Sequence, residues 1–203
     1  MKRIKVSNNV IRRMPRYLRK LDDLNAAGIE RISSGELGRQ MGLTPSQIRQ
    51  DFSCFGEFGQ QGYGYNVSNL TGEIKRIMGI DRKHTIIIVG AGNIGHALTN
   101  FPGFAETGFE VKALFDVNED LIGTEIKGHP VLDVKDMDEY IRENQIDIGV
   151  IAARRSAAQE IADRMCAAGI RGIWNFVPLD ITTSVPIENV HLSESLSTLS
   201  YKI

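Results

Sequence analysis

The sequence predicts an α/β protein in which a winged helix-turn-helix domain precedes a doubly wound parallel sheet and a C-terminal helix. Two short helical segments with capping signals lie close to the N-terminus. A glycine-spaced turn follows an apolar run in the middle of the chain. Beyond that turn, apolar strands alternate with amphipathic helices. We therefore expect a first domain over residues 1–80, a second over 81–186 and a final helical segment over 187–203.

Charge is distributed unevenly along the 203 residues, although the net charge is only −1. Residues 1–80 hold 13 lysines and arginines against seven acidic residues, whereas residues 81–203 hold 11 against 18. This asymmetry indicates that the first domain binds a polyanion. No apolar run approaches the roughly 20 residues of a membrane span, so we expect a cytoplasmic protein. The two cysteines, Cys54 and Cys166, lack the paired spacing of metal ligands, and no metal site is predicted.

The helix-turn-helix is predicted from two capping boxes that lie close together. Ser33 and Glu36 open the first helix, and Thr44 and Gln47 open the second. Pro45 stands at the first helical position, where its missing N–H is harmless. Two capped helices joined by a tight turn are typical of a DNA-binding motif.

The second of these helices is the candidate recognition helix. Ile48, Phe52 and Phe55 recur at i, i+4 and i+7, which predicts that they face the core. The residues left facing outward are Ser46, Gln47, Arg49, Gln50 and Ser53. Arginine can pair with guanine and glutamine with adenine in the major groove. A solvated helix face is the alternative. The glycine- and aromatic-rich residues 58–65 predict a hairpin that forms the wing.

Residues 85–95 form the clearest motif, a β-branched run that enters a G-x-G-x-x-G turn. Gly90 permits the turn, Gly92 lets the backbone approach a pyrophosphate, and Gly95 lets the next helix pack closely, as in a Rossmann-type domain. A second apolar strand ends in Asp116, 21 residues beyond Gly95. Such an acid accepts hydrogen bonds from the adenosine ribose and repels a 2′-phosphate. The motif therefore predicts NAD rather than NADP, with a ligand-free glycine turn as the alternative.

Two further helices are predicted, one near each end of the chain. The first is expected to begin at Pro15 and to end before Gly28. The last carries one apolar stripe, formed by Leu192, Leu196, Leu199 and Ile203. An isolated helix of about a dozen residues is marginal in water, so we expect another surface to cover this stripe.

Several segments together resemble the Rex family of redox-sensing transcriptional repressors, over nearly the whole chain. The matching segments are residues 48–59, 62–65, 90–95, 101–104, 115–117, 168–170 and 175–178. The resemblance implies a homodimer that binds palindromic operator DNA, senses the NADH/NAD⁺ ratio and releases DNA when NADH binds. It also implies that the C-terminal helix is swapped onto the partner subunit. The sequence departs from the family pattern at Gln50, Gln60, Gln61, Phe101, 152–154 and His191.

The motifs and the resemblance together predict the site residues, none of them catalytic. The predicted residues for NADH and NAD⁺ are Gly90, Ala91, Gly92, Asn93, Ile94, Gly95, Asp116, Val117 and Asn175. The predicted residues for double-stranded DNA are Arg12, Arg16, Tyr17, Ser34, Pro45, Ser46, Gln47, Arg49, Gln50, Ser53, Gln60 and Tyr63.

The sequence is also consistent with two other functions. An NAD-dependent dehydrogenase would need a substrate domain and a proton-transfer residue beside the nicotinamide, and neither is evident. The histidines are scattered, at positions 84, 96, 129 and 191. Alternatively, a winged-helix DNA binder could use its α/β domain only to dimerise. Failure to bind a dinucleotide would favour that function.

Overall fold

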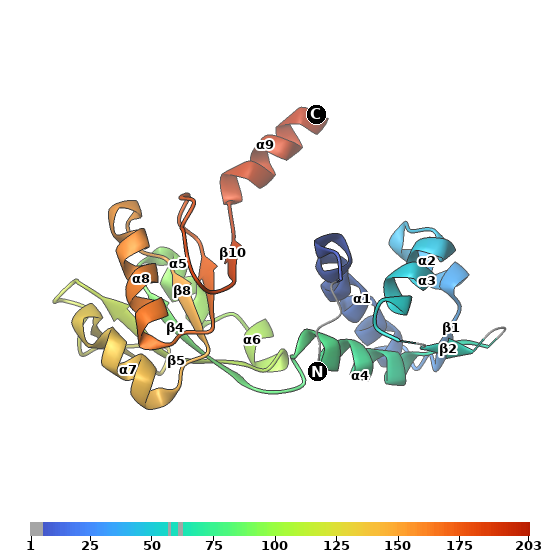
Figure 1. Ribbon diagram of the computed structural model, residues 1–203, viewed down its shortest axis with the longest axis horizontal. Helices are drawn as coiled ribbons and strands as arrows, with labels where there is room; N and C mark the ends of the chain where they lie inside the picture. The colour runs from blue at the N-terminus through green and yellow to red at the C-terminus, as the bar shows by residue number, and fades with distance from the viewer. Residues whose placement is uncertain (1–5, 57, 61–62) are drawn as a thin grey trace. The chain divides into compact units, whose positions relative to one another are not determined.

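The computed structural model describes residues 6–56, 58–60 and 63–203. The side chains of Gln60, Ala105 and Glu106 lie outside this description. The chain divides into two compact units, Met1–Arg82 and Lys83–Ile203 (Figure 1). Among the described residues, no helix is long and apolar enough to cross a membrane.

The described residues of the first unit form four helices and a small antiparallel sheet. The helices are α1 (Asn8–Ala26), α2 (Ser34–Met41), α3 (Pro45–Ser53) and α4 (Val67–Met78). The strands are β1 (Arg31–Ile32), β2 (Gly59–Gln60) and β3 (Gly64–Asn66), in the order β1-β3-β2. Helices α2 and α3 form the helix-turn-helix, and β2 and β3 form the wing. The predicted winged helix-turn-helix fold is confirmed.

The predicted N-caps of the helix-turn-helix are present. The Ser33 hydroxyl accepts a hydrogen bond from the Glu36 N–H at 3.0 Å, and the Thr44 hydroxyl accepts one from the Gln47 N–H at 3.1 Å. Helix α2 ends at Gly42 in the left-handed conformation, with φ of 69°. The caps thus fix where both helices begin.

Helix α1 begins earlier than the sequence analysis predicted. It starts at Asn8, capped by Ser7, and Pro15 lies inside it rather than at its first turn. An internal proline removes a backbone hydrogen bond and costs about 3 kcal/mol in an isolated helix. Val10 and Met14 are buried on this additional stretch. Their packing against the unit's core offsets that cost, which a local sequence pattern does not reveal.

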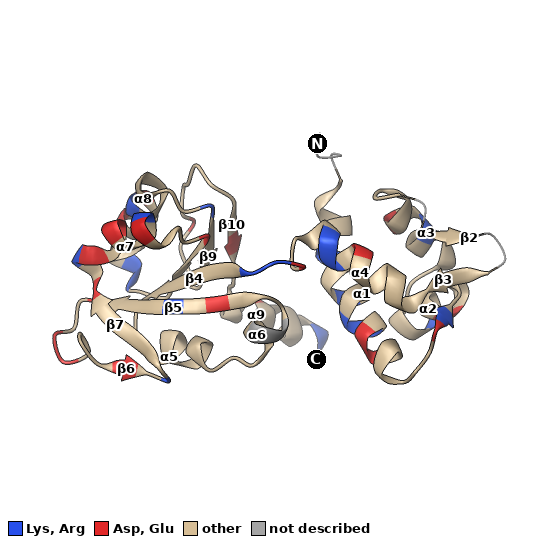
Figure 2. Cartoon of the chain, turned by 90° about the horizontal axis from the view of Figure 1, so that it is seen from below, with Lys and Arg blue, Asp and Glu red and all other residues tan. Residues whose placement is uncertain are grey.

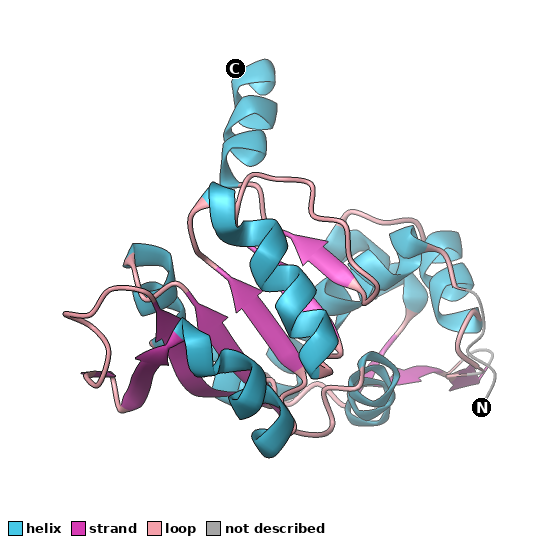
Figure 3. Ribbon diagram, turned by 60° about the vertical axis from the view of Figure 1, so that its left-hand side comes forward, coloured by secondary structure: helices cyan, strands magenta, loops and turns pink. Residues whose placement is uncertain are grey.

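The second unit contains one twisted sheet with helices on both faces (Figure 3). Its strand order is β10-β9-β8-β4-β5-β7-β6, and every neighbouring pair is parallel except β6 with β7. The strands are β4 (His84–Val89), β5 (Phe109–Asp116), β6 (Glu125–Ile126), β7 (His129–Asp133), β8 (Ile148–Ile151), β9 (Gly172–Asn175) and β10 (Ile187–Asn189). With β4 counted as the first strand, this is the doubly wound dinucleotide-binding order 3-2-1-4-5-6. The predicted Rossmann-type fold is confirmed.

Helices cover the sheet in two layers. The helical segments are α5 (Asn93–Thr99), α6 (Gly103–Glu106), η1 (Val134–Asp136), α7 (Met137–Asn144), η2 (Arg155–Ala157), α8 (Ala158–Ala168) and α9 (Leu192–Lys202). Ile87 and Val89 of β4 pack in one core with α7 and α8, whereas Ile86 and Ile88 belong to a second core that includes residues of α5 and α6. Because β4 is buried on both faces, it reads as a continuous apolar run.

Two features of the second unit were not predicted. Residues 187–189 form the edge strand β10, paired with β9, so the final helix begins only at Leu192. A hairpin joins β6 to β7 through Lys127 and Gly128, both with positive φ. Both features are very short, and their pairing partner rather than a local apolar pattern decides their conformation.

Candidate functional site

The glycine turn between β4 and α5 is shaped by close backbone contacts. Gly90 has φ of +106°, and a Cβ there would overlap the carbonyl oxygen of Ala152 at the end of β8. A Cβ at Gly95 would overlap the carbonyl oxygen of Gly90. Gly92, by contrast, faces open space, and α5 has no side-chain N-cap. Backbone N–H groups at this helix start are therefore free of a protein cap, which suits a phosphate group.

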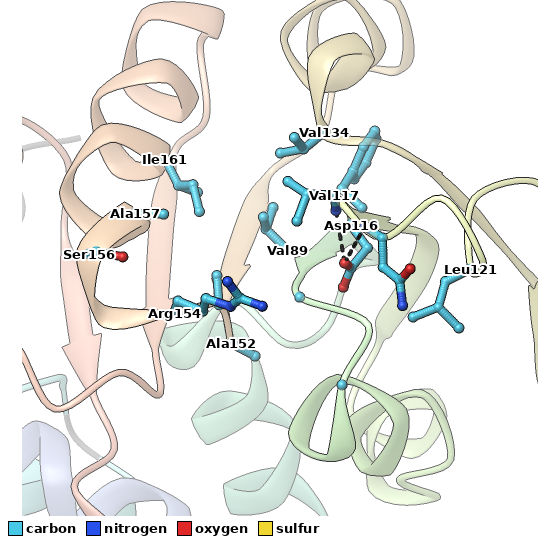
Figure 4. A pocket seen from close by; sticks show the side chains of 15 residues that line it. Val89, Asp116, Val117, Leu121, Val134, Ala152, Arg154, Ser156, Ala157 and Ile161 are labelled. Carbon is cyan, nitrogen blue, oxygen red and sulfur yellow. Dashed lines mark hydrogen bonds between the residues drawn. The ribbon is translucent and has the colours of Figure 1, made fainter.

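Asp116 ties the end of β5 to this turn. Its carboxylate accepts hydrogen bonds from the backbone N–H groups of Ala91 at 2.7 Å, Val117 at 2.8 Å and Asn118 at 2.9 Å. The same side chain lies at the wall of a cavity (Figure 4). Asp116 thus fixes the glycine turn and can still accept a hydrogen bond from a ligand hydroxyl on its remaining lone pairs.

A cavity of about 950 Å³ lies at the carboxyl ends of β4, β5 and β8. It is lined by Val89, Gly90, Gly92, Phe115, Asp116, Val117, Asn118, Leu121, Val134, Ala152, Ala153, Arg154, Ser156, Ala157 and Ile161. Strands β5 and β8 flank β4, so the cavity stands where the strand order reverses. Doubly wound sheets bind their ligands at this switch point. The volume falls within the range of small-molecule and cofactor sites, roughly 300–1,000 Å³.

The predicted cofactor residues fall into three groups. Gly90, Gly92, Asp116 and Val117 line the cavity. Ala91 and Gly95 are buried beneath the turn, and Asn93 and Ile94 are exposed on the first turn of α5. The lining residues contributed by later segments, such as Val134, Arg154 and Ile161, were not predicted. Only the strand order brings these distant segments together.

Asn175, a predicted cofactor residue, lies outside the cavity. It is fully buried at the end of β9 and does not line the cavity. Its side-chain oxygen accepts from the Val177 N–H at 2.9 Å, and its Nδ2 donates to the Val177 carbonyl oxygen at 2.9 Å and to Asn189 Oδ1 at 2.8 Å. The prediction that Asn175 contacts the cofactor is wrong, because its hydrogen bonds join the end of β9 to β10.

The recognition helix presents a polar surface. Ser46, Arg49, Gln50 and Ser53 are exposed, and so is Pro45 at its start. The Arg49 guanidinium donates a hydrogen bond to the hydroxyl of Ser34, the first residue of α2, at 3.1 Å. Arg49 and Ser34, both predicted to contact DNA, therefore lie together on the surface.

Beneath that surface, a buried ionic network joins α3 to α1. Asp51 is fully buried and accepts from Arg13 Nε at 2.6 Å and Nη2 at 2.7 Å, from the Tyr17 hydroxyl at 2.8 Å and from Gln47 Nε2 at 2.8 Å. Burial raises the pKa of Asp51. The hydrogen bonds from Arg13, Tyr17 and Gln47, together with the positive charge of Arg13, lower it by more than burial raises it. The pKa of Asp51 therefore lies below its ordinary value. Local sequence patterns do not reveal this network, because Arg13 and Tyr17 lie 38 and 34 residues from Asp51 along the chain.

The structure also corrects the predicted role of Tyr17. It was predicted to contact DNA, yet its side chain is fully buried, and burial together with the hydrogen bond to Asp51 raises its pKa. The apolar spacing with Leu21 and Leu24 was the correct guide to its position. Gln47 is half-buried and its amide nitrogen is held by Asp51, so the structure gives it a packing role.

The remaining predicted DNA residues lie on α1 and on the wing. Arg12 and Arg16 are exposed on α1, and Tyr63 is 70% exposed beside β3. Arg31 of β1, which was not predicted, donates to the Tyr63 carbonyl oxygen at 3.5 Å and places a further positive charge at the wing. The Gln60 side chain lies outside the described residues. Figure 2 shows charged residues of both signs on each unit, with basic residues on α1 and acidic residues on α7 and β6.

Comparison with known proteins covers both units. Residues 81–179 match a family model described as "CoA binding domain", and residues 5–53 match one described as "Putative DNA-binding protein N-terminus". The chain is 52% identical over 198 residues to the redox-sensing transcriptional repressor Rex of Clostridioides difficile, covering 97% of this chain and 94% of that relative.

Solved structures give the same result. The crystal structure of RSP in complex with β-NAD⁺ and operator DNA matches with a TM-score of 0.94 at 49% identity, covering 97% of this chain and 92% of that one. The crystal structure of RSP in complex with β-NADH matches with a TM-score of 0.90 at 46% identity, covering 98% and 94%. The chain therefore belongs to the Rex family of redox-sensing transcriptional repressors.

Proposed function

We propose that this protein is a repressor whose homodimer binds palindromic operator DNA through its winged-helix units and releases it when NADH binds the α/β unit. It thereby responds to the NADH/NAD⁺ ratio, and it acts in the cytoplasm. One observation carries the proposal: an exposed recognition helix and a switch-point cavity with a glycine turn and Asp116 lie in one chain. This chain matches, over 97% of its length, a structure of RSP with β-NAD⁺ and operator DNA.

The residues of the cavity fit a dinucleotide. Backbone N–H groups around Gly92 would hold the pyrophosphate, and Asp116 would accept hydrogen bonds from the adenosine ribose. Apolar walls from Val117, Leu121 and Val134 offer surface for a flat ring. When bound, the nicotinamide supplies only its oxidation state as a signal, because this function needs no hydride transfer.

The first unit supplies both kinds of DNA contact. We assign base-edge contacts to Arg49 and Gln50, which are exposed on α3, and phosphate contacts to Arg12 and Arg16 on α1. The excess of basic residues in this half of the chain favours binding to a polyanion of any sequence. Specificity for an operator then comes from α3.

The homodimer is supported by helix α9. Leu192, Leu196 and Leu199 are 63%, 68% and 54% exposed, and Ile203 is 99% exposed. An apolar stripe of this size on one subunit favours burial against a second copy. A swapped α9 would join the cofactor-binding units of the dimer to its DNA-binding units.

A dehydrogenase is less well supported by the cavity. Hydride transfer to or from a carbonyl requires a proton-transfer group close to the nicotinamide. Among the described residues that line the cavity, none is a histidine, lysine or tyrosine. The charged groups there are Asp116, already bonded to three N–H groups, and Arg154, whose guanidinium does not give up its proton.

The test is a DNA-release titration. The protein would first select an operator from a randomised palindromic library, and binding would then be followed by fluorescence anisotropy. NADH should release the DNA at concentrations at which NADPH does not, and NAD⁺ should release it much less. If NADH binds the protein but leaves operator affinity unchanged, the α/β unit is a dimerisation platform. If no dinucleotide binds, the cavity assignment fails as well.

A further inference from the structure

The cavity of the second unit holds two charged side chains on different walls. Among its described lining residues, Asp116 comes from the end of β5 and Arg154 follows β8. In Figure 4 the Arg154 side chain projects into the cavity across from Asp116. The two opposite charges thus flank the space expected to hold the ligand.

Arg154 is available to a ligand, whereas Asp116 is largely satisfied by the protein. The Asp116 carboxylate accepts three backbone hydrogen bonds. Arg154 is exposed, and within the described part of the chain it forms no salt bridge. The unit is acidic as a whole, with 11 basic against 18 acidic residues over positions 81–203. The Arg154 guanidinium can therefore donate charge-assisted hydrogen bonds to an anionic group of a ligand.

The backbone places Arg154 beside the glycine turn. The Ala152 N–H donates to the Val89 carbonyl oxygen at 2.8 Å, and the Ala152 carbonyl oxygen lies too close to Gly90 to leave room for a Cβ there. Arg154 follows two residues later. In a doubly wound sheet each half of the strands binds one mononucleotide. Asp116 on β5 marks the adenosine half, so β8 and Arg154 belong to the nicotinamide half.

We propose that Arg154 contacts the cofactor and makes the site favour NADH over NAD⁺. This inference rests on the proposed function. A guanidinium in this half attracts the pyrophosphate of both forms, which raises both affinities. It repels only the oxidised nicotinamide ring, which carries a positive charge that the reduced ring lacks. Arg154 therefore changes the ratio of NADH affinity to NAD⁺ affinity, on which sensing of the redox state depends.

The expected effect is modest because Arg154 is exposed and water screens its charge. Replacing Arg154 by glutamine should weaken NADH binding and reduce the ratio of NADH to NAD⁺ affinity by about three- to tenfold, or about 0.7–1.4 kcal/mol. Raising the salt concentration should reduce the ratio in the wild-type protein and have less effect in the variant.

The experiment is calorimetric titration of the full chain with NADH and with NAD⁺, each at low and high salt. The variants are Arg154→Gln, Arg154→Lys, which keeps the charge, and Arg155→Gln as the matched control. Arg155 is an exposed neighbour that does not line the cavity. Arg154→Lys should keep most of the ratio, and Arg155→Gln should leave it unchanged. Thermal unfolding of each variant checks that the unit remains folded.

Two results would overturn the inference. The affinity ratio could stay the same in Arg154→Gln, whether or not both affinities fall together. Arg155→Gln could reduce the ratio as much as Arg154→Gln does. Wild-type protein that binds neither nucleotide would instead overturn the proposed function itself, so the two failures are distinguishable.

Discussion

Replacement of Asp51 by alanine tests whether the buried network positions the recognition helix. Asp51 accepts two hydrogen bonds from Arg13 and one each from Tyr17 and Gln47, and its side chain is fully buried. Without the carboxylate, the Arg13 guanidinium and the Tyr17 hydroxyl lose their acceptor inside the protein. The variant should therefore be less stable in the first unit and should also bind operator DNA less tightly.

The magnitude follows from the burial of both partners. Removing one partner of a buried ion pair costs about 3–5 kcal/mol. The Arg13 side chain is 23% exposed, so water partly compensates its lost pairing, and we expect about 3 kcal/mol. In a domain of 60–100 residues, 1 kcal/mol shifts the melting temperature by about 4–8 °C. The first unit should therefore melt about 12–24 °C lower.

The assay can separate the two units because the chain has a single tryptophan, Trp174, which lies in β9 of the second unit. Circular dichroism follows helix loss in both units, and Trp174 fluorescence follows the second unit alone. Asp22→Ala is the matched control, since its 3.5 Å pairing with Lys75 is exposed and is worth no more than about 1 kcal/mol. A loss in Asp51→Ala no larger than in Asp22→Ala would refute the structural role of the network.

The network also predicts a pH dependence. The pKa of Asp51 is lower in the folded state than in the unfolded state, so its stabilisation is complete above the unfolded pKa of about 4. That stabilisation is lost as the pH falls through the folded pKa. Denaturant unfolding at pH 7, 5 and 3 should show a smaller acid-induced loss in Asp51→Ala than in the wild type. Equal losses would contradict the lowered pKa.

Three further predictions address the cofactor, the operator and the dimer. Asp116→Ala should weaken NADH binding by about 1–3 kcal/mol and NADPH binding much less, and calorimetry showing equal losses would remove Asp116 from the adenosine ribose. Arg49→Ala should relax preference at one operator position by about 1–3 kcal/mol, whereas Arg12→Ala should weaken all sequences alike and flatten the salt slope by about one unit. Anisotropy with mismatched operators decides between these effects. Deletion of residues 193–203 should leave the α/β fold intact, weaken the dimer and abolish the NADH effect, and a dimeric, NADH-responsive truncation would refute the coupling role of α9.

The cofactor turn could be predicted because its determinants are local. The glycine spacing, the preceding apolar strand and the acid at the end of the next strand all lie within one βαβ unit. The cavity's other walls could not be predicted in the same way. Arg154 and Ile161 reach the site only because β8 pairs with β4 on the side opposite β5.

The errors have related physical causes. The sequence is consistent with two positions for Tyr17, one in the core and one on the polar surface. The hydrogen bond from its hydroxyl to the buried carboxylate of Asp51 holds it in the core. Asn175 carries a polar side chain near the end of a strand, but β10 provides it with partners that no local pattern reveals. The exposed face of α3 could be predicted because the helical spacing of Ile48 and Phe52 distinguishes the buried side of the helix from the exposed side.

Linkage between NADH and operator DNA tests the account most directly. NADH affinity would be measured by calorimetry with and without saturating operator, and operator affinity by anisotropy with and without saturating NADH. Because binding free energies are reciprocal, both ligands should weaken each other by the same factor, which is typically about 5–150-fold for allosteric proteins. We predict such a factor for NADH and a much smaller one for NAD⁺. A saturating operator concentration that left the affinity for NADH unchanged would contradict NADH-driven release of DNA.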